Sequence, residues 1–85
     1  MTLQDLLNKV CDGGSDGHGS RRIGITSGMF SAYRNKRKIP SDEVVEKMIS
    51  VTGLNPVEVY MAVYAERIHN PAVVKAFRNP SQFAA

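Results

Sequence analysis

A series of helix-start signals divides the chain and leaves room only for short helices. Each signal is a Ser, Thr or Asn whose side chain can accept a hydrogen bond from a backbone amide of the first helical turn. The six residues that fit this role are Thr2, Ser15, Thr26, Ser41, Asn55 and Asn70. No segment alternates between apolar and polar residues over a useful length, so no sheet is expected. The sequence therefore predicts an all-α fold of five to six short helices.

The expected helix bounds follow from these signals and from the residues that end each segment. The first three helices are expected over 2–11, about 16–23 and about 27–36, and Ile39-Pro40 prevents the third from continuing. A fourth follows Ser41 and stops at Gly53, a fifth runs over 56–68, and a short sixth follows Pro71. The second helix is the weakest, because Gly17 and Gly19 each cost roughly 1 kcal/mol relative to Ala.

The apolar pattern predicts both a core and a surplus of apolar surface. The first helix has a clear stripe of Leu3, Leu6, Leu7, Val10 and Cys11, spaced for one helix face. In the fifth helix, the stripe expected to face the core is Val57, Tyr60, Met61, Tyr64, Ala65 and Ile68. Apolar residues outside these stripes are expected to form a dimer interface. They are Val59, Ala62, Val63, Val73, Val74 and Phe77.

Charge is concentrated in the middle of the chain. Between Gly17 and Ser41 there are six basic residues and no acidic one, whereas the rest carries five basic and eight acidic residues. Such a concentration is typical of a protein that binds a polyanion. On charge alone a solvated face is the commoner explanation, so the pattern needs support from a motif.

Several other functions lack the residues they need. A lone Cys11 and two histidines give no zinc pattern, and the glycine-rich stretch after Asp12 lacks the ligands of a calcium loop and the lysine of a phosphate-binding loop. No apolar run approaches the ~18 residues of a membrane span, and the first residues do not resemble a signal peptide. We therefore expect a cytoplasmic protein that is not an enzyme and uses no cofactor or metal.

One constellation does have the residues that it needs: a helix, a tight turn and a second helix with a basic end. Ser20 supplies a small residue for close helix packing, and Gly24 supplies the left-handed turn position. Apolar residues flank the turn and line one side of the second helix: Ile23, Ile25, Phe30 and Tyr33. The side chains on the remaining faces of that helix are short and polar, as suits a helix in a DNA major groove.

The segment Asp16–Pro40, and above all Gly24–Asn35 with the basic run after it, resembles the helix-turn-helix of the Cro and lambda-type phage repressor family. The similarity extends over about residues 2–69. It implies a DNA-binding domain over 1–69, with 70–85 as a short helix and tail used for dimerisation. Two departures concern Gly17 and Gly19 in the second helix, and Lys36, where the family often has glycine.

The resemblance implies a sequence-specific transcriptional regulator, of the phage or prophage type, that binds double-stranded DNA as a homodimer on a two-fold operator. No small-molecule ligand is expected. The residues implied to face base edges are Ser27, Gly28, Ser31, Ala32 and Asn35. Those implied mainly to hold phosphates are Arg21, Arg22, Thr26, Arg34, Lys36, Arg37 and Lys38.

Two alternatives remain open from the sequence. One is an antitoxin-type protein, which neutralises a partner protein and also binds its own promoter. An exposed apolar patch on the last helix would favour it. The other is a helical interaction module with no affinity for DNA despite its basic segment.

Overall fold

The computed structural model describes residues 1–79, and these form helices joined by short loops, with no strand among them. The predicted all-α fold is confirmed. The elements are α1 (Leu3–Cys11), α2 (Asp16–Arg22), α3 (Ser27–Arg34), α4 (Asp42–Thr52), α5 (Pro56–Tyr64), the 3-10 helix η1 (Ala65–Arg67) and α6 (Pro71–Arg78). The expected tail beyond residue 79 lies outside the described residues. Within the described part, no helix has the length and apolar character that crossing a membrane requires.

All six predicted capping side chains cap their helices, each accepting a hydrogen bond from an amide in the first turn. At α1 the cap is reciprocal, because Thr2 accepts from the Asp5 amide and Asp5 accepts from the Thr2 amide. That backbone hydrogen bond is the main reason why the pKa of Asp5 is lowered. Local hydrogen bonds between neighbouring residues thus explain where the helices start.

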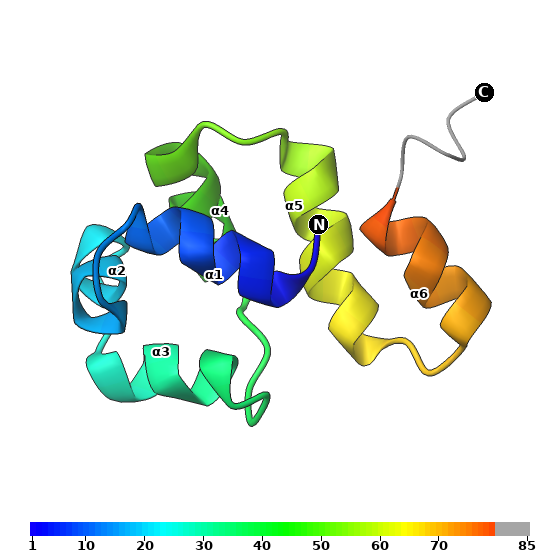
Figure 1. Cartoon of the computed structure of the whole chain (residues 1–85), viewed down its shortest axis with the longest axis horizontal. Coiled ribbons are helices and arrows are strands. Elements are labelled where there is room, and N and C mark those ends of the chain that lie inside the picture. Colours follow the sequence, from blue (N-terminus) through cyan, green and yellow to red (C-terminus); the bar gives the residue numbers. More distant parts are fainter. Residues whose placement is uncertain (80–85) are drawn as a thin grey trace.

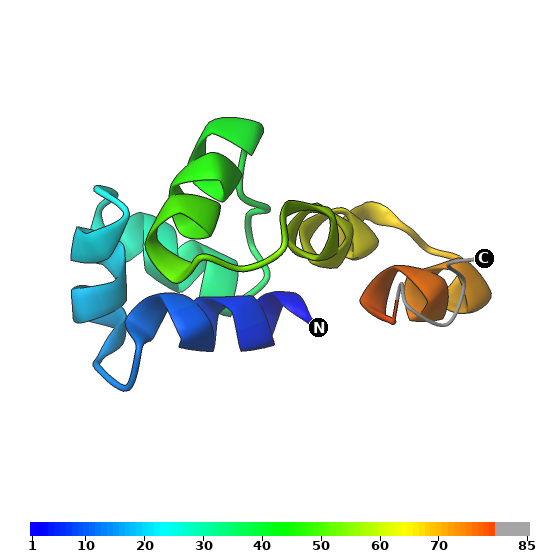
Figure 2. The ribbon, with the colours of Figure 1, turned by 90° about the horizontal axis from the view of Figure 1, so that it is seen from above.

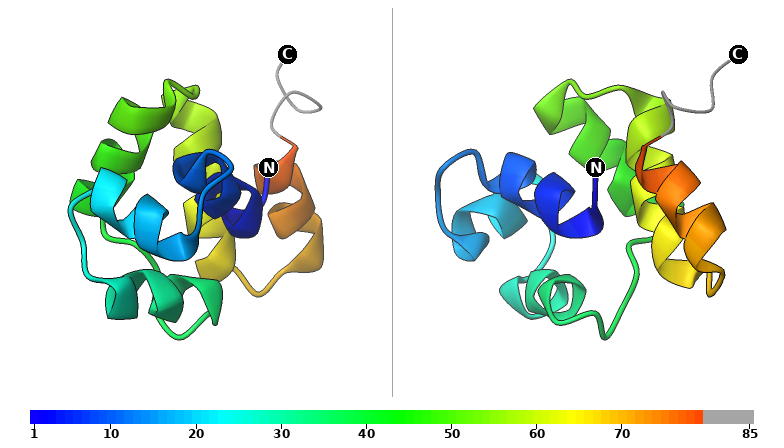
Figure 3. Two further views of the ribbon diagram at one scale, coloured as in Figure 1. Left: turned by 60° about the vertical axis from the view of Figure 1, so that its left-hand side comes forward. Right: turned by 45° about the vertical axis from the view of Figure 1, so that its right-hand side comes forward.

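The helices pack around α1, which lies across the middle of the molecule (Figure 1). α1 contacts α2, α4 and α5, and α2 in turn packs against α3. α6 lies at the far end from α2 and packs against α5 and η1 (Figures 1, 2 and 3). The pair α2–α3 therefore forms one end of an elongated domain of 37 × 25 × 22 Å.

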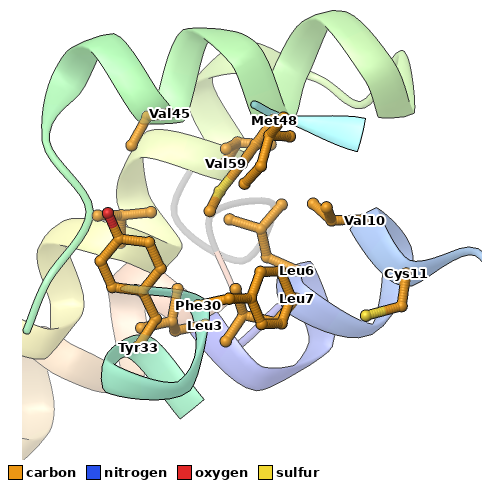
Figure 4. Packing of buried hydrophobic residues seen from close by; sticks show 12 residues of the cluster. Leu3, Leu6, Leu7, Val10, Cys11, Phe30, Tyr33, Val45, Met48 and Val59 are labelled. Atoms are coloured by element: carbon orange, nitrogen blue, oxygen red, sulfur yellow. The ribbon is translucent and has the colours of Figure 1, made fainter. Parts of the chain in front are cut away.

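The core is built from one face of α1 and the sides of α3, α4 and α5 that point toward it (Figure 4). Its fully buried large side chains are Leu3, Leu6, Leu7, Val10, Phe30, Val45, Met48, Val59 and Val63. The stripe predicted for the first helix is confirmed, including Cys11, whose side chain is buried. Burial is the largest cause that raises the pKa of the Cys11 thiol, so the side chain packs as a small apolar group.

The predicted orientation of α5 is wrong. Val59, Ala62 and Val63, expected at a dimer interface, are at most 1% exposed and belong to the core. Val57, expected in the core, is 61% exposed. α5 has apolar residues around nearly its whole circumference, and Glu58 is its one charged residue. Its pattern therefore could not indicate which side faces inward.

α6 is attached to the domain without a fully buried side chain. Val73 is 40% exposed, while Val74 and Phe77 are half-buried. Arg78 forms an ion pair with Glu66 at 3.4 Å, and the Met1 amino group donates to the Arg78 carbonyl. These contacts fix α6 beside α5 and leave Val73 on the surface, and the place of Val73, Val74 and Phe77 at a dimer interface stays a prediction.

Two tyrosines of α5 connect it to α4. The Tyr60 hydroxyl donates to Glu46 and the Tyr64 hydroxyl donates to Asp42, both at 2.7 Å. The hydrogen bond to Glu46 favours the protonated tyrosine and raises the pKa of Tyr60 to about 12. The two rings meet edge to face with centroids 5.8 Å apart. These two hydrogen bonds fix α5 against α4 near the surface of the domain.

Candidate nucleic-acid interface

The turn between α2 and α3 is tight and closed by backbone hydrogen bonds. The Ile25 amide donates to the Ser20 carbonyl at 3.0 Å, and the Gly24 amide donates to the Arg21 carbonyl at 3.2 Å. Gly24 has φ +67°, a left-handed conformation that glycine adopts without steric cost. Ile23 on one side of the turn is buried. The predicted role of Gly24 is therefore confirmed, and the turn fixes how α3 leaves α2.

α2 comes close to both α1 and α3 at Gly19. A methyl group there would lie 2.7 Å from the Cys11 sulfur and 3.0 Å from the Phe30 ring. Ser20, which the sequence suggested for this role, is also buried and donates a hydrogen bond to the Gly17 carbonyl. Gly17 and Gly19 lie within α2, whereas Gly13 and Gly14 precede it in the turn after α1. The absence of a side chain at Gly19 lets α1 and α3 come close to α2.

The two glycines of α2 are expected to respond in opposite ways to alanine. Gly17→Ala should raise the free energy of unfolding by roughly 0.5–1 kcal/mol, because its methyl group meets only ordinary contacts beyond 3.4 Å and alanine favours the helix. Gly19→Ala should lower the free energy of unfolding by about 1–2 kcal/mol. The cost of forcing a methyl group against Cys11 and Phe30 should exceed the gain from the higher helix propensity of alanine. Urea unfolding followed by circular dichroism measures both, and stabilisation by Gly19→Ala would contradict the close packing.

α3 presents one side to the core and the other to solvent. Phe30 and Tyr33 are buried, as predicted. Burial raises the pKa of the Tyr33 hydroxyl. Ala32 is also buried, at 8% exposure, so the prediction that it faces base edges is wrong. It lies beside Tyr33 on the inward half of a helix only eight residues long.

The outward side of α3 is polar and small. Ser27, Gly28 and Asn35 are exposed and Ser31 is half-exposed, so four of the five residues expected to face base edges lie on accessible surface. Thr26 is exposed at the start of the helix, where its oxygen accepts from the Met29 amide. Its hydroxyl hydrogen stays available as a donor. Such a surface can approach another molecule closely.

Ser31 and Asn35 act as a pair at the end of this surface. The Asn35 amide group donates to the Ser31 carbonyl at 2.9 Å and to the Ser31 hydroxyl at 3.2 Å. The pair orients the Asn35 side chain along α3 rather than leaving it free. The amide nitrogen of Asn35 thus donates both hydrogen bonds within the chain, and its Oδ1 stays available to accept a hydrogen bond from a partner.

Arg34 is held by the protein's own groups. Its guanidinium forms an ion pair with Asp16 at 3.1 Å, donates to Gln4 and stacks over the Phe30 ring at 5.7 Å. These contacts join α3 to α1 and α2. The prediction that Arg34 holds a phosphate is therefore corrected: its contacts give it a role in positioning α3.

Arg22 is also engaged within the domain. It donates to the carbonyls of Val10 and Val51, and the distance to the latter is 2.8 Å. Val10 lies in the last turn of α1 and Val51 in the last turn of α4, where carbonyls lack helical partners. One guanidinium thus caps two helices, and the prediction that Arg22 holds a phosphate is corrected as well.

The remaining four basic residues of the segment are Arg21, Lys36, Arg37 and Lys38, and all are exposed. Among residues 1–79 none of them takes part in an ion pair. Three of the four, Lys36, Arg37 and Lys38, follow Asn35 at the end of α3, and we call these three residues the basic loop. Their positive charge is therefore not neutralised by an acidic neighbour and is available to an anionic partner.

The basic loop has a fixed backbone. The Lys36 amide donates to Tyr33 and the Arg37 amide donates to Ala32, which closes the helix end in the arrangement that usually uses glycine. Lys36 occupies the left-handed position with φ +60°. Farther along, Pro40 is fully buried and anchors the loop to the core. The basic side chains therefore project from a defined scaffold rather than from a flexible tail.

A hollow of about 430 Å³ lies between this loop, the turn and the start of α4. It is lined mainly by apolar side chains, among them Ile25, Met29 and Val44, and Lys38 also lines it.

Within residues 1–79, no group of three or more His, Cys, Asp or Glu residues could hold a metal ion. The region around α3 therefore combines two chemical features: the polar outer face of the helix and the uncompensated positive charge of the exposed basic residues.

Sequence reasoning missed three functions in this region: the close approach at Gly19 and the internal roles of Arg22 and Arg34. Each depends on a residue distant in sequence, and no local pattern indicates such a partner.

Comparison with protein-family models, curated proteins and solved structures finds no significant match to the chain.

Proposed function

We propose that the protein is a sequence-specific regulator of transcription that binds double-stranded DNA through α3. One observation carries the proposal: the small polar outer face of α3 is followed by a hydrogen-bonded loop of uncompensated positive charge. Short side chains allow an α-helix to enter the major groove, and the basic loop that follows α3 would then contact the phosphates beside it. The Cro and lambda-type repressor resemblance supports the same function.

The proposed contacts divide into two groups. Ser27, Gly28, Ser31 and Asn35 face base edges and provide specificity. Thr26, Arg21, Lys36, Arg37 and Lys38 hold phosphates and provide most of the affinity. Arg22 and Arg34 contribute indirectly, because they fix the helices on which the other side chains are mounted.

The proposed mechanism is steric. A homodimer occupies a two-fold operator in the cytoplasm, as a phage or prophage regulator does, and controls access of the polymerase. It requires no catalytic step, cofactor or small-molecule ligand. Antitoxin activity is the second candidate, and the observation that favours it is the 40% exposure of Val73 on α6.

Binding to duplex DNA should weaken steeply with salt. Each protomer has four exposed basic residues outside ion pairs, so a dimer has eight. Contacts from these residues to about five phosphates would give a slope of log affinity against log salt near −4 or steeper. Fluorescence anisotropy with labelled duplex measures the slope. Lys38→Ala should flatten it by about 2 per dimer, whereas Lys47→Ala on α4 should leave it unchanged. A flat response of the wild type would remove DNA binding from the account.

A further inference from the structure

The hollow between the turn, the basic loop and the start of α4 has an apolar wall. Its volume of about 430 Å³ lies within the range of small-molecule sites. The wall consists of four half-buried side chains, which are Ile25, Met29, Ile39 and Val44. A molecule with an apolar body would remove this wall from water on binding, which is favourable.

Tyr33 brings an unused hydrogen-bond donor to the hollow. Its side chain is only 3% exposed and lines the hollow, yet within residues 1–79 its hydroxyl forms no hydrogen bond. Figure 4 shows the hydroxyl oxygen at the end of the ring that points away from α3. Buried tyrosine hydroxyls usually have a hydrogen-bond partner. An acceptor group placed in the hollow would supply the partner that the chain does not.

Lys38 gives the hollow a positive charge. Lys38 lines the hollow, is exposed and forms no ion pair among residues 1–79. Thr26 and Ser41, the N-caps of α3 and α4, also line it, so the positive ends of two helix dipoles lie beside it. No acidic residue lines the hollow. A negatively charged group is therefore favoured there.

We propose that the hollow binds a small organic acid, in which a carboxylate is attached to an apolar body such as one aromatic ring. The apolar body contacts the wall, the Tyr33 hydroxyl donates to a carboxylate oxygen and Lys38 supplies the opposite charge. A phosphate group alone suits the hollow less well, because it has no apolar part to cover Ile25 and Val44. The sequence predicted no small-molecule ligand, because the residues of this site meet only in the folded chain.

The site overlaps the surface proposed for DNA. Thr26 and Lys38 line the hollow, and both are also assigned to phosphates. An acid bound there would neutralise the lysine and place its own negative charge beside the DNA backbone. We therefore expect the acid and DNA to oppose each other's binding, and this part of the inference rests on the proposed function.

NMR titration of the chain with phenylacetate tests the site. The methyl signals of Ile25, Ile39 and Val44 should shift with a Kd on the order of 1 mM or tighter, as suits so small a molecule. Phenylacetamide, which has the same ring and no charge, should bind more weakly, and inorganic phosphate should leave these signals in place. No shift with phenylacetate, or equal shifts with phosphate, would overturn the proposal.

Two variants and a control test the polar contacts. Tyr33→Phe retains the ring and removes only the hydroxyl, so it should weaken phenylacetate binding about 2- to 10-fold. Lys38→Ala should remove most of the preference for phenylacetate over phenylacetamide, whereas Lys47→Ala on α4, outside the lining, should retain it. Both lysines are exposed, so neither replacement should disturb the fold. Unchanged binding by Tyr33→Phe, or equal effects of the two lysine variants, would contradict the assigned contacts.

Fluorescence anisotropy with labelled duplex DNA tests the opposition between the two ligands. Phenylacetate at a concentration equal to its own Kd should weaken duplex binding about twofold per protomer. Acetate at the same concentration adds the same ionic strength without a ring and should have a smaller effect. Equal effects of acetate and phenylacetate would overturn the expected opposition.

The two titrations together distinguish this inference from the proposed function. A chain whose hollow binds phenylacetate but that ignores duplex DNA at low salt would refute the proposed function and support the site. A chain that binds duplex DNA while phenylacetate leaves the methyl signals of the hollow unchanged would refute the site alone.

Discussion

Phe30→Ala is expected to lower the free energy of unfolding by about 3–5 kcal/mol. Phe30 is completely buried, and its ring packs where Gly19 brings α2 close and where the Arg34 guanidinium stacks. The free energy of unfolding of a native domain is only about 5–15 kcal/mol, so Phe30→Ala would remove a large part of it. Because the ring seats α3 on the domain, DNA binding should fall together with the folded fraction.

Equilibrium urea unfolding, followed by circular dichroism, measures this loss. Phe30→Leu should cost less, because more of the cavity stays filled. Met29→Ala, one position earlier and half-buried, is the matched control and should cost much less than Phe30→Ala. A Phe30→Ala loss below about 1 kcal/mol would contradict the role of the ring as the main anchor of α3.

Asn35→Ala is expected to change which operator sequence is preferred, at a cost of about 1–3 kcal/mol at the base pair that Asn35 contacts. The effect should depend on Ser31, because the Ser31 carbonyl and hydroxyl orient the Asn35 amide. Ser31→Ala should therefore also alter preference, and the two substitutions together should cost less than the sum of their separate costs. Binding titrations against single-base operator variants measure these energies.

Lys38→Ala provides the contrast. Lys38 is exposed in the basic loop and is assigned to phosphate, so its loss should weaken binding to every sequence by a similar factor. If Lys38→Ala changed base preference while Asn35→Ala did not, the assignment of α3 as the reading helix would be wrong.

Most of the fold was predictable because its determinants are local. Each helix start depends on a Ser, Thr or Asn and an amide two or three residues later, and all six were identified. The orientation of α5 was not predictable, because apolar residues occur on both of its sides. Only the packing of α1, α4 and α6 against it decides that Val63 is inside and Val57 outside.

The candidate site was predictable in part for the same reason. The turn at Gly24 and the exposed basic run follow from nearby residues. Arg22 and Arg34 have the same charge as Arg37 and Lys38, and the sequence does not distinguish them. Their separate roles depend on partners such as Val51 and Gln4, which only the folded chain brings within reach.

Selection of bound sites from random duplex DNA tests the central claim most directly. The account predicts enrichment of one two-fold symmetric sequence, whose half-sites are about one helical turn, roughly 34 Å, apart. The enrichment should become weaker or shift when the selection is repeated with Asn35→Ala. Recovery of no common sequence from duplex DNA at low salt would contradict sequence-specific binding through α3.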